Sequence, residues 1–272
     1  MLTNRRRISQ NCAVICFGVL IACRSIGIFA QTPTSPADAL NQGVAAFRAG
    51  HYSDAIEDFK KALVLDPNYT TAKLYLGTTY AYQVVPNLKT PENLAVAENA
   101  IETFKQIPED DPGYHVVLKQ LASIYRNIGQ LDEARNMELA ALGLVPDDAE
   151  AHYTVGVIDW MQAYKFSVDA LLPDGLQDDG LGNTRMSPAT CEKIKTHNAQ
   201  LVDDAIAHLS RAIELNRNYS DAMAYLNLVY RRRADFDCND PSARTQDVAS
   251  ADKWSKQAAE IRGKAPTATA PQ

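Results

Sequence analysis

The chain has 272 residues, of which 46% are hydrophobic, and a formal net charge of −6 at pH 7. This length and composition allow a sizeable core. The acidic balance argues against a general binder of nucleic acid or of anionic membranes, because such binding rests on clustered cations. We therefore expect no nucleic-acid partner, and contact with a membrane only through an N-terminal anchor.

Residues 1–30 have the pattern of a targeting segment. Three arginines at positions 5–7 precede an uncharged apolar run at 12–22, which is too short to span a membrane and is typical of a secretory signal. Cleavage after Ala30 competes with cleavage before Cys23, where Leu-Ile-Ala-Cys resembles a bacterial lipobox and would leave Cys23 lipidated. An uncleaved anchor is the third alternative. Each predicts an exported protein that is periplasmic, secreted or lipid-anchored.

Small residues recur along the rest of the chain at 34 residues, or at 34 plus an insertion. Gly43 and Gly77 are 34 apart, whereas Gly77 and Ala122 are 45 apart. The same steps separate a second series (Ala55, Ala100, Ala134) and a third (Pro67, Pro112, Pro146). Such a period predicts an all-α solenoid of antiparallel helix pairs. The predicted organisation is a linker at 31–36, a solenoid at 37–263 with repeats at 37–69, 70–114, 115–148, 149–219 and 220–263, and a disordered tail at 264–272.

The segment 43–67 resembles a tetratricopeptide repeat. Gly43 and Ala55 match the close-contact positions of that family, Phe59 matches its aromatic position, and Ala62 and Pro67 complete the pattern. The resemblance implies a right-handed solenoid with a protein or peptide partner bound in a concave groove lined by the first helix of each repeat. Later repeats depart from the pattern at three positions: Glu138 stands at the aromatic position, Arg217 at the closing proline and Asn227 at a small residue.

Three insertions fall between the first and second helix of a repeat, and we expect them on one edge of the solenoid. Each ends in a capping residue followed by proline, at Thr90, Ser187 and Asp240, which is a start signal for a helix. We therefore expect long second helices in repeats two, four and five. Residues 166–186 are polar and rich in glycine, and they predict a solvated loop or a functional flap.

Two cysteines lie in the repeat region, at positions 191 and 238. Their places ahead of equivalent helices would allow a disulfide between neighbouring overhangs in an oxidising compartment. A redox-active thiol at Cys191 and two unrelated thiols are the alternatives.

We find no signature of catalysis, of a cofactor or of a metal site. The histidines lack the spacing of zinc ligands, and no phosphate-binding loop or nucleophile elbow occurs. The acids Asp174, Asp178 and Asp179 suit a solvated acidic loop better than a calcium loop, because no glutamate follows at the required distance.

The resemblance to tetratricopeptide repeats also implies which residues face the groove. Aromatic rings there would bury apolar side chains of an extended peptide, while cations and amides would hold its carboxylates or carbonyls. The alternative for the rings is packing between helices. The candidates are Phe47, Arg48, Leu74, Tyr82, Lys119, Arg126, Asn127, Tyr153, Trp160, Arg231 and Arg232.

These patterns together predict an exported, non-enzymatic scaffold that binds a protein or peptide. One alternative is a lipid-anchored lipoprotein that supports envelope assembly. Another, of a different class, is an enzyme or a small-molecule receptor built on the insertion at 164–200. This last alternative requires titratable residues that converge on a closed pocket.

Overall fold

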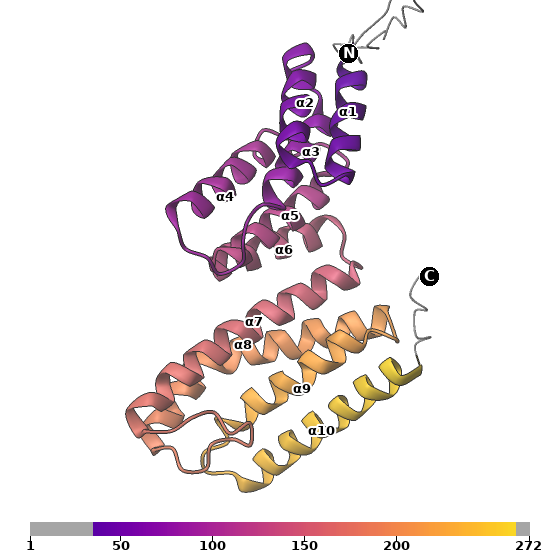
Figure 1. The fold of residues 1–272 in the computed structure, drawn as a ribbon. Helices are drawn as coiled ribbons and strands as arrows, with labels where there is room; N and C mark the ends of the chain where they lie inside the picture. Colours follow the sequence, from indigo (N-terminus) through magenta and orange to yellow (C-terminus); the bar gives the residue numbers. More distant parts are fainter. Residues whose placement is uncertain (1–34, 265–272) are drawn as a thin grey trace, which may run out of the picture. The chain divides into compact units, whose positions relative to one another are not determined.

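The computed structural model describes residues 35–264, and within that range it consists of ten α-helices, one short 3₁₀ helix and their connections, without a strand (Figure 1). The predicted targeting segment with Cys23, the start of the linker and residues 265–272 of the tail lie outside the described residues. The helices are α1 (Pro36–Arg48), α2 (Tyr52–Leu65), α3 (Thr70–Ala81), α4 (Pro91–Phe104), α5 (Tyr114–Asn127), α6 (Leu131–Leu144), α7 (Ala149–Leu171), η1 (Leu172–Asp174), α8 (Pro188–Leu215), α9 (Ser220–Ala234) and α10 (Pro241–Lys264).

The α-helices pack in five successive pairs. The first helix of each pair (α1, α3, α5, α7 and α9) packs against the second (α2, α4, α6, α8 and α10), and each pair contacts the next along the chain. First helices also contact one another, as α7 does α9 (Figure 1). The predicted all-α solenoid of helix pairs is confirmed.

Small residues let the two helices of a pair approach closely. A Cβ atom placed on Gly43 of α1 would lie 2.5 Å from the ring of Phe59 on α2, a separation that real side chains do not tolerate. The ring therefore occupies the space that glycine leaves, and both residues are buried. The same relation holds for Gly77 with Phe104 and for Gly156 with Leu209.

All three predicted start signals cap a helix. The side chain of Thr90 accepts from the backbone N–H of Asn93 at 3.3 Å, and that of Ser187 accepts from Thr190 at 3.2 Å. Asp240 accepts from two N–H groups, at 3.0 and 2.9 Å. Proline follows each cap as the first helical residue, so that no N–H is left without a partner there.

The second helices differ from the prediction in one repeat. Helices α8 and α10 are long, with 28 and 24 residues, but α4 has 14 residues, the same as α2. Helix α4 starts earlier in its repeat, because Ala100 is its tenth residue whereas the equivalent Ala55 is the fourth residue of α2. It also ends earlier, at Phe104. Pro108 has no N–H to donate to the carbonyl of Phe104, and its ring opposes a further turn.

Part of the predicted loop at 166–186 is helical. Helix α7 continues to Leu171 and runs beside the equally extended start of α8 (Figure 1). Ala170 and Leu171 are buried against Ile194 of α8, so the two overhanging helices form a small core of their own. The remaining loop starts at Gly175, whose φ of +68° is a conformation that favours glycine.

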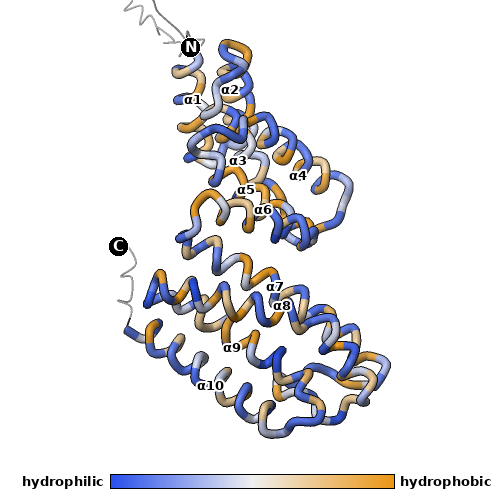
Figure 2. The backbone as a smooth tube through the Cα atoms, turned by 180° about the vertical axis from the view of Figure 1, so that it is seen from behind, coloured by the Kyte–Doolittle hydropathy of each residue, from blue (hydrophilic) through white to orange (hydrophobic). Residues whose placement is uncertain are grey.

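Hydrophobic positions recur at intervals along each helix and alternate with hydrophilic ones (Figure 2). Such spacing places one stripe of each helix in the core between neighbours. Between residues 35 and 264, none of the helices combines the length and the apolar character that crossing a bilayer requires.

Candidate functional site

Two of the predicted groove residues belong to an aromatic cluster near the N-terminal end of the described chain. Phe47 of α1 lies 5.1 Å from Tyr82 and 5.7 Å from Tyr52, measured between ring centroids. Tyr82 is 65% exposed, so one side of this N-terminal aromatic cluster (Phe47, Tyr52 and Tyr82) faces solvent. Arg48 beside it is also exposed, whereas Leu74 packs half-buried against the core around α4 and α5.

Lys119 of α5 joins two consecutive repeats. Its ammonium group is 2.9 Å from Asp148, the N-cap of α7, and 2.6 Å from Glu150 in the first turn of α7. Burial opposes the charge on Lys119, but its hydrogen bonds to the two carboxylates outweigh that effect and raise its pKa. The predicted groove cation is therefore already engaged by two acids.

A cavity of about 370 Å³ lies beside this ion cluster. We call it the Glu138 pocket, after the residue that α6 contributes. Lys119 and Arg126 line it from α5, and Asp148 and Glu150 line it from the N-cap and first turn of α7. The predicted residue Asn127 is not part of its lining; the backbone carbonyl of Asn127 accepts from the N–H of Asn87 at 2.8 Å.

Glu138 is unusual because it is acidic and only 3% exposed. Burial raises its pKa to about 8, although Lys119 and Arg126 act in the opposite direction. Within residues 35–264, its Oε2 atom has no hydrogen-bond partner. The sequence shows Glu138 at an aromatic position, but it does not show that the residue lines a cavity.

The predicted residues Tyr153 and Trp160 lie in a second aromatic cluster, formed by α7 and α9 and the turn before α9. Ring centroids are 5.3 Å apart between Trp160 and Tyr164, 5.3 Å between Trp160 and Tyr225, and 5.7 Å between Tyr153 and Tyr225. Burial raises the pKa of Tyr153 to about 12. We call this set the α7–α9 aromatic cluster; its members are Tyr153, Trp160, Tyr164, Tyr219 and Tyr225.

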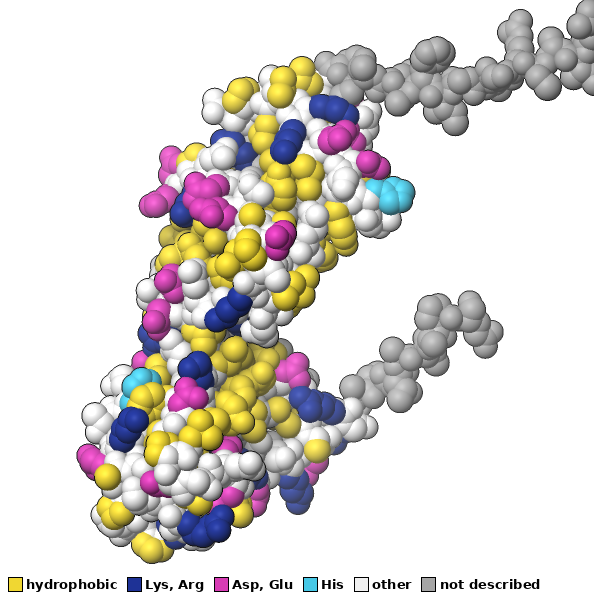
Figure 3. Space-filling view, turned by 60° about the vertical axis from the view of Figure 1, so that its left-hand side comes forward, with side chains coloured by type: hydrophobic (Ala, Val, Ile, Leu, Met, Phe, Trp, Pro, Cys, Tyr) yellow, Lys and Arg dark blue, Asp and Glu magenta, His cyan; other side chains and the backbone are white. Residues whose placement is uncertain are grey.

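The rings of the α7–α9 aromatic cluster both pack on the core and reach the surface. Tyr153 and Trp160 are half-buried against the core of repeats four and five, and Tyr164 is exposed. On the face that Figure 3 presents, hydrophobic side chains gather in patches with acidic and basic side chains between them. Sequence reasoning missed Tyr164 and Tyr225, because they do not occupy the family positions from which the candidates were taken.

Arg231 and Arg232 hold the insertion loop, and the prediction that Arg232 faces a groove is wrong. Arg232 is 2% exposed and forms ion pairs with Asp178 at 2.5 Å and with Asp235 at 2.8 Å. Arg231 donates to the carbonyl of Gly180 at 2.8 Å and pairs with Asp252 at 2.7 Å. Long guanidinium groups on α9 thus meet the acids and carbonyls of the loop.

The acids of the insertion are structural. Asp174 accepts from the N–H of Ser187 at 2.8 Å, and this hydrogen bond lowers its pKa. Asp179 accepts from two backbone N–H groups of its own loop. Asp174 and Asp179 are exposed, as expected of a solvated acidic loop, whereas Asp178 is half-buried and pairs with Arg232. Across the described part of the chain, no three His, Cys, Asp or Glu side chains are placed to hold a metal ion.

A disulfide joins Cys191, near the start of α8, to Cys238 in the connection between α9 and α10. The Cα atoms are 6.0 Å apart, an ordinary separation for this bond. The predicted pairing is thus present, and it links the overhangs of repeats four and five.

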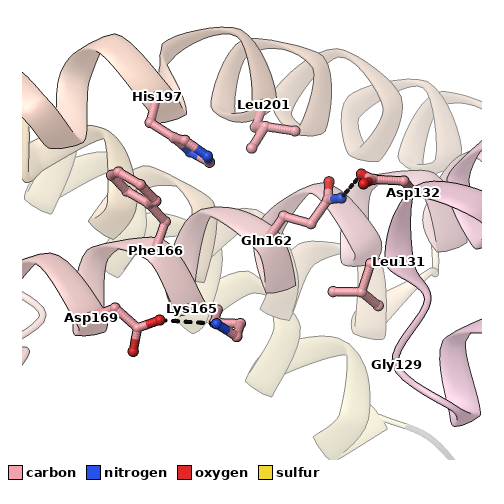
Figure 4. Close-up of a pocket in the computed structure, with 9 residues that line it drawn as sticks. All are labelled: Gly129, Leu131, Asp132, Gln162, Lys165, Phe166, Asp169, His197 and Leu201. Carbon is pink, nitrogen blue, oxygen red and sulfur yellow. Dashed lines mark hydrogen bonds and ion pairs between the residues drawn. The ribbon is translucent and has the colours of Figure 1, made fainter.

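A further cavity, of about 510 Å³, lies where the start of α6 meets α7 and α8 (Figure 4). Phe166 and His197 stack there with ring centroids 3.6 Å apart. Figure 4 shows Lys165 paired with Asp169 on one side. On the opposite side Gln162 bonds Asp132 at 2.5 Å. Lys165 and the amide nitrogen of Gln162 in this edge pocket are therefore paired with neighbouring acids, while Oε1 of Gln162 has no hydrogen-bond partner within residues 35–264.

The comparisons with known proteins agree with this architecture. Residues 40–69 match the family model described as a tetratricopeptide repeat. The chain is 34% identical over 112 residues to the DnaJ homolog subfamily C member 7 homolog of Schizosaccharomyces pombe, a match that covers 40% of this chain and 21% of that protein. It is 24% identical over 191 residues to human interferon-induced protein with tetratricopeptide repeats 2, covering 69% of this chain and 35% of that protein. The chain thus spans between a fifth and about a third of these relatives.

Solved structures share the fold at low sequence identity. The crystal structure of MamA superposes with a TM-score of 0.54 and 20% identity, covering 87% of this chain and 98% of that one. YrrB, described as a TPR protein with an unusual peptide-binding site, superposes with a TM-score of 0.51 and 14% identity, covering 84% and 92%. Residues 40–69 thus match a tetratricopeptide repeat, and the helix pairs of residues 35–264 have the fold of these tetratricopeptide-repeat solenoids.

Proposed function

We infer that this chain is an exported, non-enzymatic scaffold that binds an extended polypeptide across its first helices α5, α7 and α9. The observation that carries this proposal is the adjacency of an aromatic surface and a charged pocket. Tyr153 belongs to the α7–α9 aromatic cluster, and the next residue, Thr154, lines the Glu138 pocket. A single extended segment could therefore reach both.

The chemistry of the two surfaces suits a polypeptide. Rings such as Trp160 and Tyr225 offer apolar contact area at a small cost in conformational entropy, because they have few rotatable bonds. Arg126 lines the pocket half-buried, and none of the described residues pairs with it, so its donors are available to a carbonyl or carboxylate. The peptide-binding site described for YrrB, which shares the fold, supports the same use of this architecture.

The non-enzymatic part of the proposal is supported by how the insertion is built. Asp174, Asp178 and Asp179 bond to the loop and to α9. In the edge pocket, Lys165 and Gln162 are taken up by Asp169 and Asp132. These arrangements stabilise the overhanging helices, and they favour a scaffold over an enzyme or a small-molecule receptor at 164–200.

Selection of binding peptides from a random library on the full chain tests the proposed site. We expect Tyr164→Ala and Tyr225→Ala each to weaken the selected peptides at least tenfold, measured by fluorescence anisotropy. The matched control is Val64→Ala, because Val64 is an exposed apolar residue on α2. Equal affinity in all three variants would exclude the α7–α9 aromatic cluster as the binding surface.

Export rests on the arginines and the apolar run of residues 1–30, and the disulfide suits an oxidising compartment. The intact mass of the protein from a secreting or membrane fraction tests it. A mass beginning at Gln31, the residue after Ala30, supports a soluble exported scaffold. A mass beginning at Cys23 with acyl chains supports the lipid-anchored alternative, and the mass of the uncleaved chain in the membrane fraction supports the uncleaved anchor. Recovery of the protein from the cytoplasmic fraction alone would contradict export.

A further inference from the structure

The Glu138 pocket lies where repeat three lacks the bulky side chain that the other repeats carry at this position. Four residues beyond the recurring small residue of the second helix stand Phe59 in α2, Phe104 in α4 and Leu209 in α8. All three are fully buried and fill the space against a glycine of the first helix. The equivalent residue in α6 is Glu138, and the cavity of about 370 Å³ lies beside it.

Stability alone gives no reason for an acid at this place. A buried carboxyl group without a partner is unfavourable, and an apolar side chain of similar size would be better tolerated. Glu138 is nonetheless 3% exposed, and its Oε2 atom is unpartnered among residues 35–264. A group of this kind that lines a cavity is suited to a ligand that supplies the missing partner.

The charges around the pocket indicate whether that ligand group is positively or negatively charged. Three carboxylates line it, from Glu138, Asp148 and Glu150, against the two cations Lys119 and Arg126. Lys119 already binds Asp148 and Glu150. Ionised Glu138 would therefore leave the lining with an excess of one negative charge, which a cationic group would neutralise.

We propose that the Glu138 pocket receives a basic side chain, lysine or arginine, of the polypeptide bound across the first helices. This inference rests on the proposed function and specifies one position of its ligand. A long side chain with a terminal cation can pass the rim at Glu150 and bring its donors to Glu138. A pocket of about 370 Å³ lies within the range of small ligand sites.

Cation binding should be coupled to loss of a proton. Burial holds the pKa of Glu138 at about 8, so the free pocket contains mostly the neutral acid at pH 7. A bound cation favours the carboxylate, and affinity should rise as the pH rises from 6 to 8, by up to tenfold per unit. The other charged or titratable groups of the pocket are His115, Lys119 and Arg126 on α5, and Asp148 and Glu150 at the N-cap and first turn of α7.

The test combines peptide selection with variants of one residue. Peptides selected on the full chain are resynthesised with each lysine replaced by norleucine and each arginine by citrulline, which removes the charge and keeps most of the shape. Binding is measured on the unmodified protein, on Glu138→Gln, on Glu138→Leu and on the control Glu133→Gln. Glu133 is an exposed acid on the same helix. Both Glu138 variants are expected to fold, because neither introduces a buried charge.

We expect each selected peptide to contain one basic residue that matters for the pocket. Neutralising it should lower affinity at least tenfold for the unmodified protein and for Glu133→Gln. The same change should lower affinity less than twofold for Glu138→Gln and Glu138→Leu. The affinity of the unmodified peptide for Glu138→Gln should also be independent of pH. Peptides that depend on Tyr164 and Tyr225 yet bind Glu138→Gln unchanged, or that insert an acidic residue beside Arg126, would overturn this inference and leave the proposed function intact. Recovery of no binding peptide would overturn both.

Discussion

Arg232 on α9 and Asp178 in the loop before α8 form an ion pair of 2.5 Å, although 54 residues separate them in the sequence. The same guanidinium pairs with Asp235, one turn along α9. Burial by itself would raise the pKa of Asp178, but Arg232 holds it below the ordinary value. Because Arg232 is almost completely buried and Asp178 is half-buried, water screens this anchor of the loop only weakly.

Replacing Arg232 by methionine should strongly destabilise the fold. The substitution leaves Asp235 buried without its cation, and breaking a buried pair from one side costs about 3–5 kcal/mol. Urea unfolding followed by circular dichroism measures the effect. Arg217→Met, at an exposed position, is the control and should change stability by less than about 0.5 kcal/mol. A loss below about 1 kcal/mol for Arg232→Met would mean that the pair does not anchor the loop.

Two glycines in helices should respond to alanine in opposite directions. At Gly43 a Cβ atom would meet the ring of Phe59 at 2.5 Å, so Gly43→Ala should destabilise by about 1–3 kcal/mol. At Gly143 of α6 nothing lies within 4 Å, and alanine should stabilise by about 0.5–1 kcal/mol through its helix propensity. Thermal unfolding of both variants checks the pair. Stabilisation by both would show that α1 and α2 can move apart at no cost.

Loss of the Cys191–Cys238 disulfide should loosen repeats four and five. The bond spans 47 residues, for which the loop-entropy model gives about 4 kcal/mol of stabilisation, less any strain. Reduction with dithiothreitol should therefore lower the urea midpoint and speed hydrogen exchange in α8 and α10. The double variant Cys191→Ser, Cys238→Ser should show the lower midpoint with or without the reductant. An unchanged midpoint on reduction would contradict the prediction.

Glu138 should make stability depend on pH. Its folded-state pKa of about 8 lies above the unfolded value of about 4.3, so the folded protein binds more protons between these limits. The stabilisation is complete below about pH 4 and is lost as the pH rises through 8, by up to about 1.4 kcal/mol per unit. Relative to the unmodified protein, Glu138→Gln should gain stability from pH 5 to pH 8.

The difference in stability between the unmodified protein and Glu138→Gln reports on Glu138 alone. Other buried acids with raised pKa values, such as Asp159 and Asp235, are present in both proteins. Urea unfolding at half-unit steps of pH gives the two curves. Parallel curves would show that Glu138 is not protonated in the folded state at neutral pH.

Features that depend on local spacing could be predicted from the amino-acid sequence. The 34-residue period predicts the helix pairs, because small residues such as Gly43 must recur wherever two helices cross. The caps at Thr90, Ser187 and Asp240 could also be predicted, because a capping side chain bonds to N–H groups only two or three residues away.

Features that join distant segments could not be predicted, because they depend on how the helices pack together. Arg232 has the position of a groove residue in its repeat, and its burial depends on a loop that folds back on α9. Glu138 is visible in the sequence as a departure from the aromatic position, but its pocket requires α5, α6 and the start of α7 to be placed together. Long-range packing sets burial and charge pairing, and no local pattern encodes it.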